Sequence, residues 1–262
     1  MIIQDFAKRM SAGVPITLVT CYDAWSAALI AETDIDCVLV GDSVAMVVHG
    51  HDTTIPADLE MMTTHTAAVR RGAPDAFVIG DMPFLSYRRG LAASVDAAGA
   101  LMRSGANAVK LEGAAGNLEL IRHLVESGVP VMGHLGLTPQ SVHQLGGFRV
   151  LAKNGRAAER LIEQAVELEQ AGCFAIVLEA IPAAVAERAT ARMTIPTIGI
   201  GAGRHVDGQV LVLQDLLGVS TSYRPKFVRT WMDGSKMITT ALQSYHRDVT
   251  EGRFPNGGES YE

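Results

Sequence analysis

The sequence predicts an α/β fold, a (β/α)8 TIM barrel that forms a single domain. Short β-branched apolar runs alternate with longer helical patterns along the chain. Runs this apolar are typical of parallel strands that are buried on both faces, and eight of them can be counted. The length of 262 residues is close to the ~250 residues of a typical barrel domain. An open, doubly wound sheet is the alternative, because one miscounted strand would change the topology.

The expected strands are the eight apolar runs themselves. They cover residues 16–21, 37–41, 77–80, 108–111, 131–135, 175–178, 197–200 and 210–213. The expected helices cover residues 24–32, 59–70, 94–104, 118–126, 157–170 and 183–192, and a seventh would be very short, near 207–209. Glycine follows several of these patterns where a helix C-cap belongs, as at Gly72 and Gly128. Two longer loops, 43–58 and 136–156, are expected to be functional.

The chain shows no linker, so the expected domain covers residues 1–262. Its last part is expected to hold a helix over about 232–247 and a mobile tail over about 255–262. No apolar run approaches the ~18 residues of a membrane span. Asp5, Lys8 and Arg9 interrupt the stretch that a signal peptide would need to be apolar.

Composition and charge narrow the possible partners. Hydrophobic residues make up 48% and charged residues 19%, which argues against disorder. A net charge of −6 without a basic cluster favours neither nucleic acid nor an anionic membrane as a partner. Cys21, Cys37 and Cys173 form no CxxC pair, so they are interpreted as small core residues in a reducing compartment. A cytoplasmic location is therefore expected.

Ionisable residues stand at or next to the carboxyl ends of five consecutive expected strands, which is where the active sites of barrel enzymes lie. They are Asp42 (followed by Ser43), Asp81, Lys110 with Glu112, His134 and Glu179. Each has a structural interpretation when taken alone: an aspartate can cap a helix or a turn, a lysine can reach the rim, and a histidine can be a hydrogen-bonded core residue. Together, around one barrel mouth, they indicate a catalytic site.

The residue types favour a hard cation and a small acidic substrate. Carboxylate oxygens suit Mg²⁺, which keeps several waters, so Asp42 and Asp81 can share one ion, with Glu112 bound directly or through water. Such an ion can chelate a 2-oxo acid and stabilise an enolate, Lys110 can offset its charge, and Glu179 is free to act as the base. Zinc is disfavoured, since the pair His49 and His51 is a weak signal.

The glycine run at 199–203 reads GxGxG and ends in an arginine where the dinucleotide-binding fingerprint needs its last glycine. No acidic residue follows on a second strand about 20 residues later, so a nucleotide-binding fold is disfavoured. In a barrel, the loop after the seventh strand often binds an anion or ligand through backbone N–H groups.

With these motifs in place, the sequence resembles the ketopantoate hydroxymethyltransferase family of the phosphoenolpyruvate mutase/isocitrate lyase superfamily. The most specific segments are GHLGLTPQS and GHDTT. The matching segments are VTCYDAWSA (19–27), VLVGDSVAMVVHGHDTT (38–54), HTAAVRRGAP (65–74), GDMPFLSY (80–87), SGANAVKLEG (104–113), VPVMGHLGLTPQSVHQLGG (129–147), IVLEAIP (176–182), IPTIGIGAG (195–203), DGQVLVLQDLLG (207–218) and PKFV (225–228).

The resemblance implies specific roles. Asp42 and Asp81 would bind Mg²⁺ with Glu112 in its ligand or water shell, and Glu179 would be the general base. The residues implied to contact the 2-oxo acid are Asp42, Ser43, Asp81, Lys110 and, on the substrate side, His134. The family transfers a one-carbon unit from 5,10-methylenetetrahydrofolate to 3-methyl-2-oxobutanoate, giving 2-dehydropantoate on the route to pantothenate. A cytoplasmic homodecamer of two pentameric rings is implied as well.

Two rival functions remain at this point. The first is another superfamily enzyme, a carbon–carbon lyase or mutase acting on a 2-oxo acid. Such enzymes typically carry a lid cysteine in a KKCGH-type motif, which the sequence lacks. The second is a non-catalytic barrel that binds a small acid, which metal-dependent proton exchange would distinguish from an enzyme.

Overall fold

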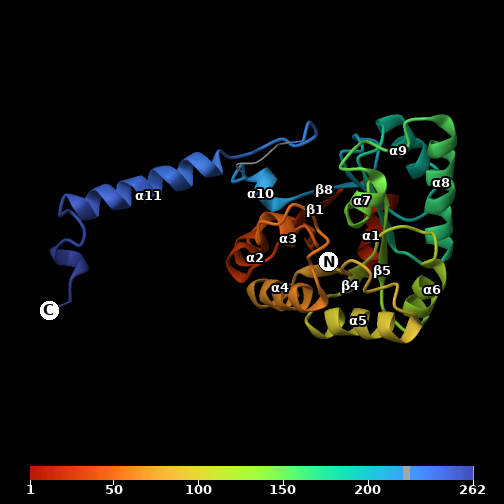
Figure 1. Ribbon diagram of the computed structural model, residues 1–262, viewed down its shortest axis with the longest axis horizontal. Coiled ribbons are helices and arrows are strands. Elements are labelled where there is room, and N and C mark those ends of the chain that lie inside the picture. Colours follow the sequence, from red (N-terminus) through yellow and green to blue (C-terminus); the bar gives the residue numbers. More distant parts are fainter. Residues whose placement is uncertain (221–224, 262) are drawn as a thin grey trace. The chain divides into compact units, whose positions relative to one another are not determined.

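The computed structural model describes residues 1–220 and 225–261 and contains a closed barrel of eight parallel strands (Figure 1). Each strand pairs with the next, and β8 pairs with β1 to close the ring. The strands are β1 Ile16–Thr20, β2 Cys37–Val40, β3 Phe77–Asp81, β4 Ala108–Lys110, β5 Val131–Gly136, β6 Ala175–Glu179, β7 Thr197–Ile200 and β8 Gly208–Leu211. The predicted (β/α)8 fold class is confirmed, and the open sheet is excluded.

Helices surround the barrel at most of the predicted positions (Figure 1). The main helices are α2 Ala24–Ala31, α4 Leu59–Gly72, α5 Leu91–Arg103, α6 Leu118–Glu126, α8 Gly155–Gln170 and α9 Ala183–Thr190. Short helices interrupt the two long loops: α3 Val44–Val47 in the first, and η1 Pro139–Ser141 with α7 Val142–Leu145 in the second. Side-chain caps begin several of the helices, as where Asn154 accepts from the Ala157 N–H at the start of α8.

The prediction of a short helix near 207–209 is wrong, and the eighth strand begins two residues earlier than predicted. In the described chain, Asp207 leads directly into β8, whose Gly208 pairs with Ile16 and Ile198. The Asp207 carboxylate accepts from the Thr197 N–H and hydroxyl, which ties the turn to the start of β7. The prediction missed the start of β8 because its first two residues, Gly208 and Gln209, have no apolar side chains.

The amino end of the barrel is closed by α1, which spans Ile3–Ser11. Its one buried residue, Phe6, packs edge-to-face against Phe77 and Phe174, with ring centroids 5.3 and 4.9 Å apart. These rings join the core formed by the inward side chains of the strands. The predicted burial of Cys21, Cys37 and Cys173 is confirmed, and all three thiols are free.

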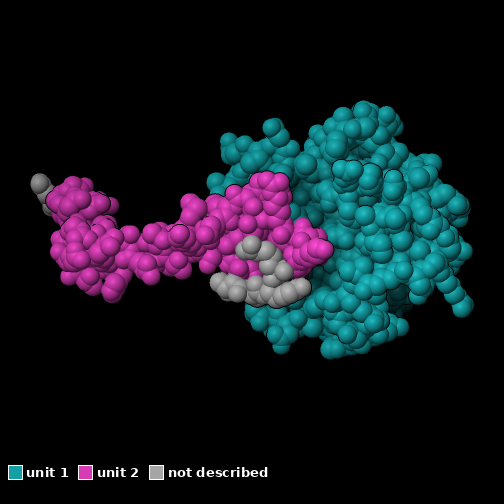
Figure 2. Space-filling view, turned by 90° about the horizontal axis from the view of Figure 1, so that it is seen from above, with its two compact units in different colours: residues 1–212 teal, residues 213–262 magenta. Residues whose placement is uncertain are grey.

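The chain divides into two compact units, Met1–Val212 and Leu213–Glu262 (Figure 2). The first contains the whole barrel. The second contains α10 Leu213–Leu216, α11 Gly234–Thr250 and the 3-10 turn η2 Gly257–Glu259. Helix α11 overlaps the helix expected over about 232–247. A single domain and a mobile tail stay predictions, and Glu262 of that tail lies outside the described residues. No helix in the described ranges is both long enough and apolar enough to span a membrane.

Candidate active site

The interior of the barrel changes from apolar to charged along its strands. Side chains two residues apart on a strand point to the same face. In β3, Phe77 and Ile79 belong to the apolar core, and Asp81 follows them at the carboxyl end. In β6, Val177 is a core residue and Glu179 follows it. The charged side chains of these strands therefore extend the inward-facing rows beyond the core.

Strands β4 and β5, which lie between β3 and β6, show the same change from apolar to charged side chains. Core residue Ala108 precedes Lys110 in β4, and Glu112 is two residues further on. Core residue Met132 precedes His134 in β5. The structure therefore brings the predicted charged residues to one mouth of the barrel. The buried ones are Asp42, Asp81, Lys110, Glu112 and His134, whereas Glu179 and the neutral Ser43 are partly exposed.

Lys110 and Asp81 form the central ion pair of the site. Lys110 Nζ lies 2.6 Å from Asp81 Oδ2, and the two side chains are only 4% and 1% exposed. The backbone N–H of Asp42 donates to the same Asp81 oxygen at 3.3 Å, which places these two acids side by side. Lys110 thus points into the barrel interior, and neither carboxylate serves as a helix cap.

His134 lies between two carboxylates. Its Nδ1 is 3.5 Å from Glu112 Oε1, and its Nε2 is 3.3 Å from Glu179 Oε2. Neither contact has hydrogen-bond geometry, so both are close ionic contacts. The arrangement links the carboxylate predicted to lie near the metal with the carboxylate predicted to be the base.

Backbone geometry at the end of β5 allows Gly136 to lie close to the backbone of Glu179. Gly136 has a φ of 92°, and a Cβ atom there would lie 2.2 Å from the carbonyl oxygen of Glu179. Only glycine fits at this position. The residue after Glu179, Ala180, has a φ of 47°, which is uncommon for a residue with a side chain. The position of Glu179 is therefore determined by both strands.

Three neutral polar residues of the site carried no sequence prediction. Tyr22, which follows β1, hydrogen-bonds through its hydroxyl to Ser43 Oγ at 2.7 Å. Gln140, in the loop after β5, donates from Nε2 to Asp42 Oδ2 at 2.8 Å. Tyr87, after β3, donates its hydroxyl to Gln140 Oε1 at 2.7 Å. All three follow strand carboxyl ends and lie within the segments VTCYDAWSA, GDMPFLSY and GHLGLTPQS, and those two signals could have found them.

Burial and mutual charge shift the pKa values in this group. Burial, followed by the neighbouring carboxylates Asp81 and Glu112, raises the pKa of Asp42 well above its usual range. Burial lowers the pKa of Lys110, but the surrounding carboxylates outweigh it, so that the net shift is upward. Burial and the Lys110 charge also lower the pKa of His134, while Glu112 and Glu179 raise it further, to about 9. Lys110 and His134 are therefore cations at neutral pH.

The donor atoms fit a hard divalent cation. Asp81 Oδ1 is buried and accepts no hydrogen bond, which is costly for a carboxylate unless a cation faces it. Glu112 Oε1 accepts no hydrogen bond either, and His134 Nδ1 lies 3.5 Å from it. Mg²⁺ binds one or two carboxylates and completes its shell with water. Across residues 1–220 and 225–261, no group of three or more His, Cys, Asp and Glu side chains is arranged to hold a metal ion. The fit is thus to two adjacent carboxylates plus water, with a third carboxylate further out.

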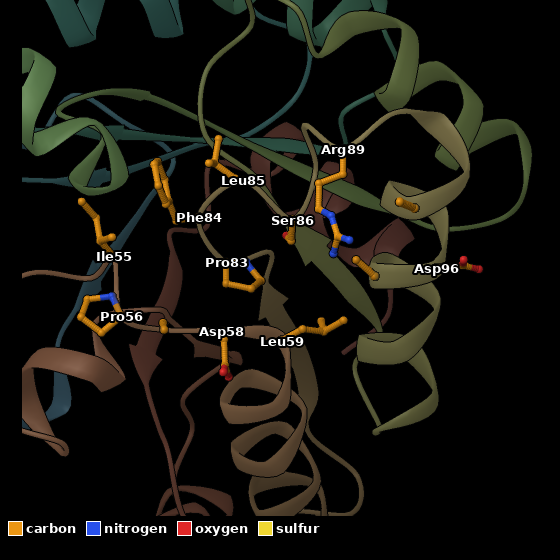
Figure 3. Close-up of a pocket in the computed structure, with 13 residues that line it drawn as sticks. Ile55, Pro56, Asp58, Leu59, Pro83, Phe84, Leu85, Ser86, Arg89 and Asp96 are labelled. Carbon is orange, nitrogen blue, oxygen red and sulfur yellow. The ribbon is translucent and has the colours of Figure 1, made fainter.

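A separate pocket of about 490 Å³ lies next to the end of β3 (Figure 3). Its lining is mostly apolar, and the exposed side chains of Phe84 and Leu85 contribute to it. Of its acids, Asp58 is already used as the N-cap of α4, where it accepts from the Met61 N–H. None of the buried charged residues of the barrel mouth lines this pocket.

Comparison with known proteins identifies relatives along the whole chain. A family model described as ketopantoate hydroxymethyltransferase matches residues 1–257. A protein of Bdellovibrio bacteriovorus named 3-methyl-2-oxobutanoate hydroxymethyltransferase is 55% identical over 259 residues, which cover 99% of this chain and 98% of that protein. A Coxiella burnetii protein of the same name is 51% identical over 253 residues, with 96% and 95% covered.

Solved structures of more distant proteins share the fold. A 2,3-dimethylmalate lyase, described as a PEP mutase/isocitrate lyase superfamily member, has a TM-score of 0.61 at 13% identity, over 99% of this chain and 91% of that one. A phosphonopyruvate hydrolase solved with oxalate and Mg²⁺ has a TM-score of 0.64 at 10% identity, over 99% and 93%. The chain therefore belongs to the ketopantoate hydroxymethyltransferase family, on a barrel shared with the phosphoenolpyruvate mutase/isocitrate lyase superfamily.

Proposed function

We propose that this protein transfers the one-carbon unit of 5,10-methylenetetrahydrofolate to 3-methyl-2-oxobutanoate, forming 2-dehydropantoate for pantothenate synthesis. Relatives at 51–55% identity carry the name of this enzyme, which favours it over a lyase or mutase of the same superfamily. The observation that carries the proposal is the barrel mouth, where two adjacent acids, a buried lysine and a partly exposed glutamate meet. That combination suits proton removal next to a charged 2-oxo acid.

In this proposal Asp42 and Asp81 hold Mg²⁺, and Glu112 reaches it through water. The cation, when bound, supplies a Lewis acid for the carboxylate and keto oxygens of the substrate. Lys110, whose Nζ is 2.6 Å from Asp81, offsets the negative charge of the oxo acid and the charge that develops as the C3 proton leaves. Asp42, Asp81, Ser43 and His134 also contact the substrate and fix its orientation.

Glu179 is proposed to accept the C3 proton. Its side chain is 17% exposed, so it can reach a bound substrate, and the 3.3 Å contact with His134 keeps the carboxylate in position. The C3 carbon then bonds to the methylene carbon of the folate, and water supplies the oxygen of the new hydroxymethyl group. Both carbon–nitrogen bonds of that methylene carbon break, and the two nitrogens take up the C3 proton and one proton of the water. The folate is a co-substrate that leaves as tetrahydrofolate.

The experiment that tests this proposal is proton exchange without folate. Wild-type protein with Mg²⁺ should exchange the C3 proton of 3-methyl-2-oxobutanoate with D₂O, and proton NMR of the C3 signal follows the exchange. Glu179→Gln keeps the shape of the side chain but cannot accept a proton, so exchange should fall by about 10²–10⁴-fold. A wild type without metal-dependent exchange contradicts the enzyme and supports a non-catalytic acid-binding barrel. Normal exchange by Glu179→Gln moves the base to another residue, His134 first, because this variant removes the Glu179 charge that helps to raise the pKa of His134.

The remaining parts of the proposal concern the cell and the assembly. We expect a cytoplasmic homo-oligomer, a decamer in the family's pattern, without nucleic acid or membrane partners. The acidic net charge of −6 and the three free, buried thiols are in keeping with this expectation. Light scattering of the purified protein measures the oligomer mass and would contradict the decamer if it gave a monomer.

A further inference from the structure

Gln140 connects the ends of three neighbouring strands at the barrel mouth. Its side-chain Nε2 donates to Asp42 Oδ2 at 2.8 Å, after β2, and to the Met82 carbonyl at 3.0 Å, after β3. Its backbone N–H donates to Glu112 Oε2 at 3.1 Å, after β4. The residue itself is only 3% exposed and belongs to the loop after β5. One residue therefore contacts two of the three carboxylates assigned to the cation.

Tyr87 sets the orientation of the Gln140 amide. A glutamine amide has an acceptor side and a donor side, and rotating it by half a turn exchanges them. The buried Tyr87 hydroxyl donates to Oε1, so Nε2 is the atom turned toward Asp42. In the opposite orientation, the amide oxygen would face a carboxylate and the Met82 carbonyl, which are both acceptors. The tyrosine thus specifies the donor that the aspartate receives.

Each carboxylate receives its hydrogen bond from Gln140 on one oxygen. The Gln140 backbone N–H engages Glu112 through Oε2, whereas Glu112 Oε1 accepts no hydrogen bond and lies 3.5 Å from His134 Nδ1. A neutral amide holds a carboxylate without competing for it as a lysine would, and without the repulsion that a glutamate would add. Groups that orient metal-binding carboxylates in this way tune the affinity for the ion.

We propose that Gln140 is a positioning residue whose side chain, oriented by Tyr87, holds Asp42 in the arrangement that receives the divalent cation, while its backbone N–H engages Glu112. The inference rests on the proposed function and adds the residues that prepare the carboxylates for the ion. The Gln140 side chain acts through Asp42, and Tyr87 acts through the Gln140 side chain, so removing Tyr87 should have no further effect once that side chain is gone.

The test measures Mn²⁺ binding to the full-length protein without substrates, by electron paramagnetic resonance of the free ion. Gln140→Ala should raise the Kd by about 10–100-fold. Tyr87→Phe should raise it less, because the glutamine remains but its amide can turn. In the double variant, Tyr87→Phe should add nothing to Gln140→Ala, since its effect passes through the missing side chain. Gln144→Ala, an exposed glutamine in α7 of the same loop, is the matched control and should bind like wild type.

Thermal unfolding of each variant separates a lost fold from a lost orientation. Weaker Mn²⁺ binding in a variant that melts near the wild-type temperature supports the inference. If Gln140→Ala does not fold, Tyr87→Phe decides, and an unchanged Kd in that variant overturns the inference. An unchanged Kd in folded Gln140→Ala, with binding lost in Asp81→Ala, overturns the inference while leaving the proposed function in place. A wild type that binds no Mn²⁺ overturns the cation site together with the inference.

Discussion

The amino end of the barrel interior is filled by aromatic and aliphatic side chains, whereas the carboxyl end is filled by charged ones. Phe6, Phe77 and Phe174 pack edge-to-face at the first end. At the second end, Lys110 lies against Asp81 at 2.6 Å in an equally buried setting. The same strands supply both ends, so the difference is one of position along each strand.

The comparison separates what stabilises the fold from what serves the chemistry. Burying apolar surface stabilises a fold by about 25 cal/mol per Å². Burying an ion pair costs desolvation energy that the pairing often fails to recover. The apolar end therefore provides stability, and the charged end is maintained despite its cost. Substitutions at the two ends should accordingly differ in what they impair.

Lys110→Ala should have the largest effect, because it impairs both stability and activity. Removing one partner of a buried pair leaves Asp81 unpaired, which should cost about 3–5 kcal/mol of unfolding free energy. Substrate binding should weaken and C3 proton exchange should slow, because the developing negative charge loses the lysine that offsets it. Urea titration and the NMR exchange assay measure the two losses. Kinetics equal to wild type would mean that the lysine plays no part in catalysis.

Phe6→Ala should lower stability alone. The buried ring is lost from the core, at a cost of about 3–5 kcal/mol. Well below the melting temperature, kcat/KM should stay at the wild-type value, since the site lies at the other end of the strands. Phe6→Leu is the control and should lose much less stability. A large fall in kcat/KM for a folded Phe6→Ala protein would show that the two ends are coupled.

His134 should make stability depend on pH in metal-free protein. Its folded-state pKa of about 9 lies above the ordinary value of 6.5. The stabilisation is therefore complete below pH 6.5 and is lost as the pH rises through about 9, on the order of 3 kcal/mol in total. Urea titrations from pH 6 to 10 with a chelator measure it. His134→Gln should lose less stability over this range than wild type, and a parallel decline in both proteins would contradict the assignment.

The smallest change in stability should come from replacing the whole ion pair. Asp81→Val combined with Lys110→Met removes both charges at similar volume, and such replacements are often neutral or stabilising by about 1–4 kcal/mol. The double variant should fold at least as well as Lys110→Ala does, yet show no proton exchange. A double variant less stable than Lys110→Ala would mean that the charged end also supports the fold.

Much of the site was predictable because it follows a local rule. Apolar runs marked the strands, and the rule that active-site residues follow the carboxyl ends of barrel strands placed Asp81 and Glu179 at one mouth. The apolar pattern failed at β8, where Gly208 and Gln209 carry no apolar signal and pairing with β1 and β7 defines the strand. Local pattern therefore identified strands whose buried row consists of apolar side chains and missed the start of β8, where the buried row begins with a glycine.

The sequence by itself determined the barrel, its charged mouth and the family, since these depend on periodicity and on contiguous motifs. Only the tertiary structure decided which groups meet. Gln140 and Asp42 are 98 residues apart in the sequence, and the closed barrel brings them into contact. The contact between Tyr87 and Gln140 arises in the same way. The pairing of Lys110 with Asp81, and the placement of His134 between Glu112 and Glu179, likewise come from neighbouring strands and their loops. Side-chain direction is a property of a few successive residues, whereas such contacts depend on how the whole ring of strands is assembled.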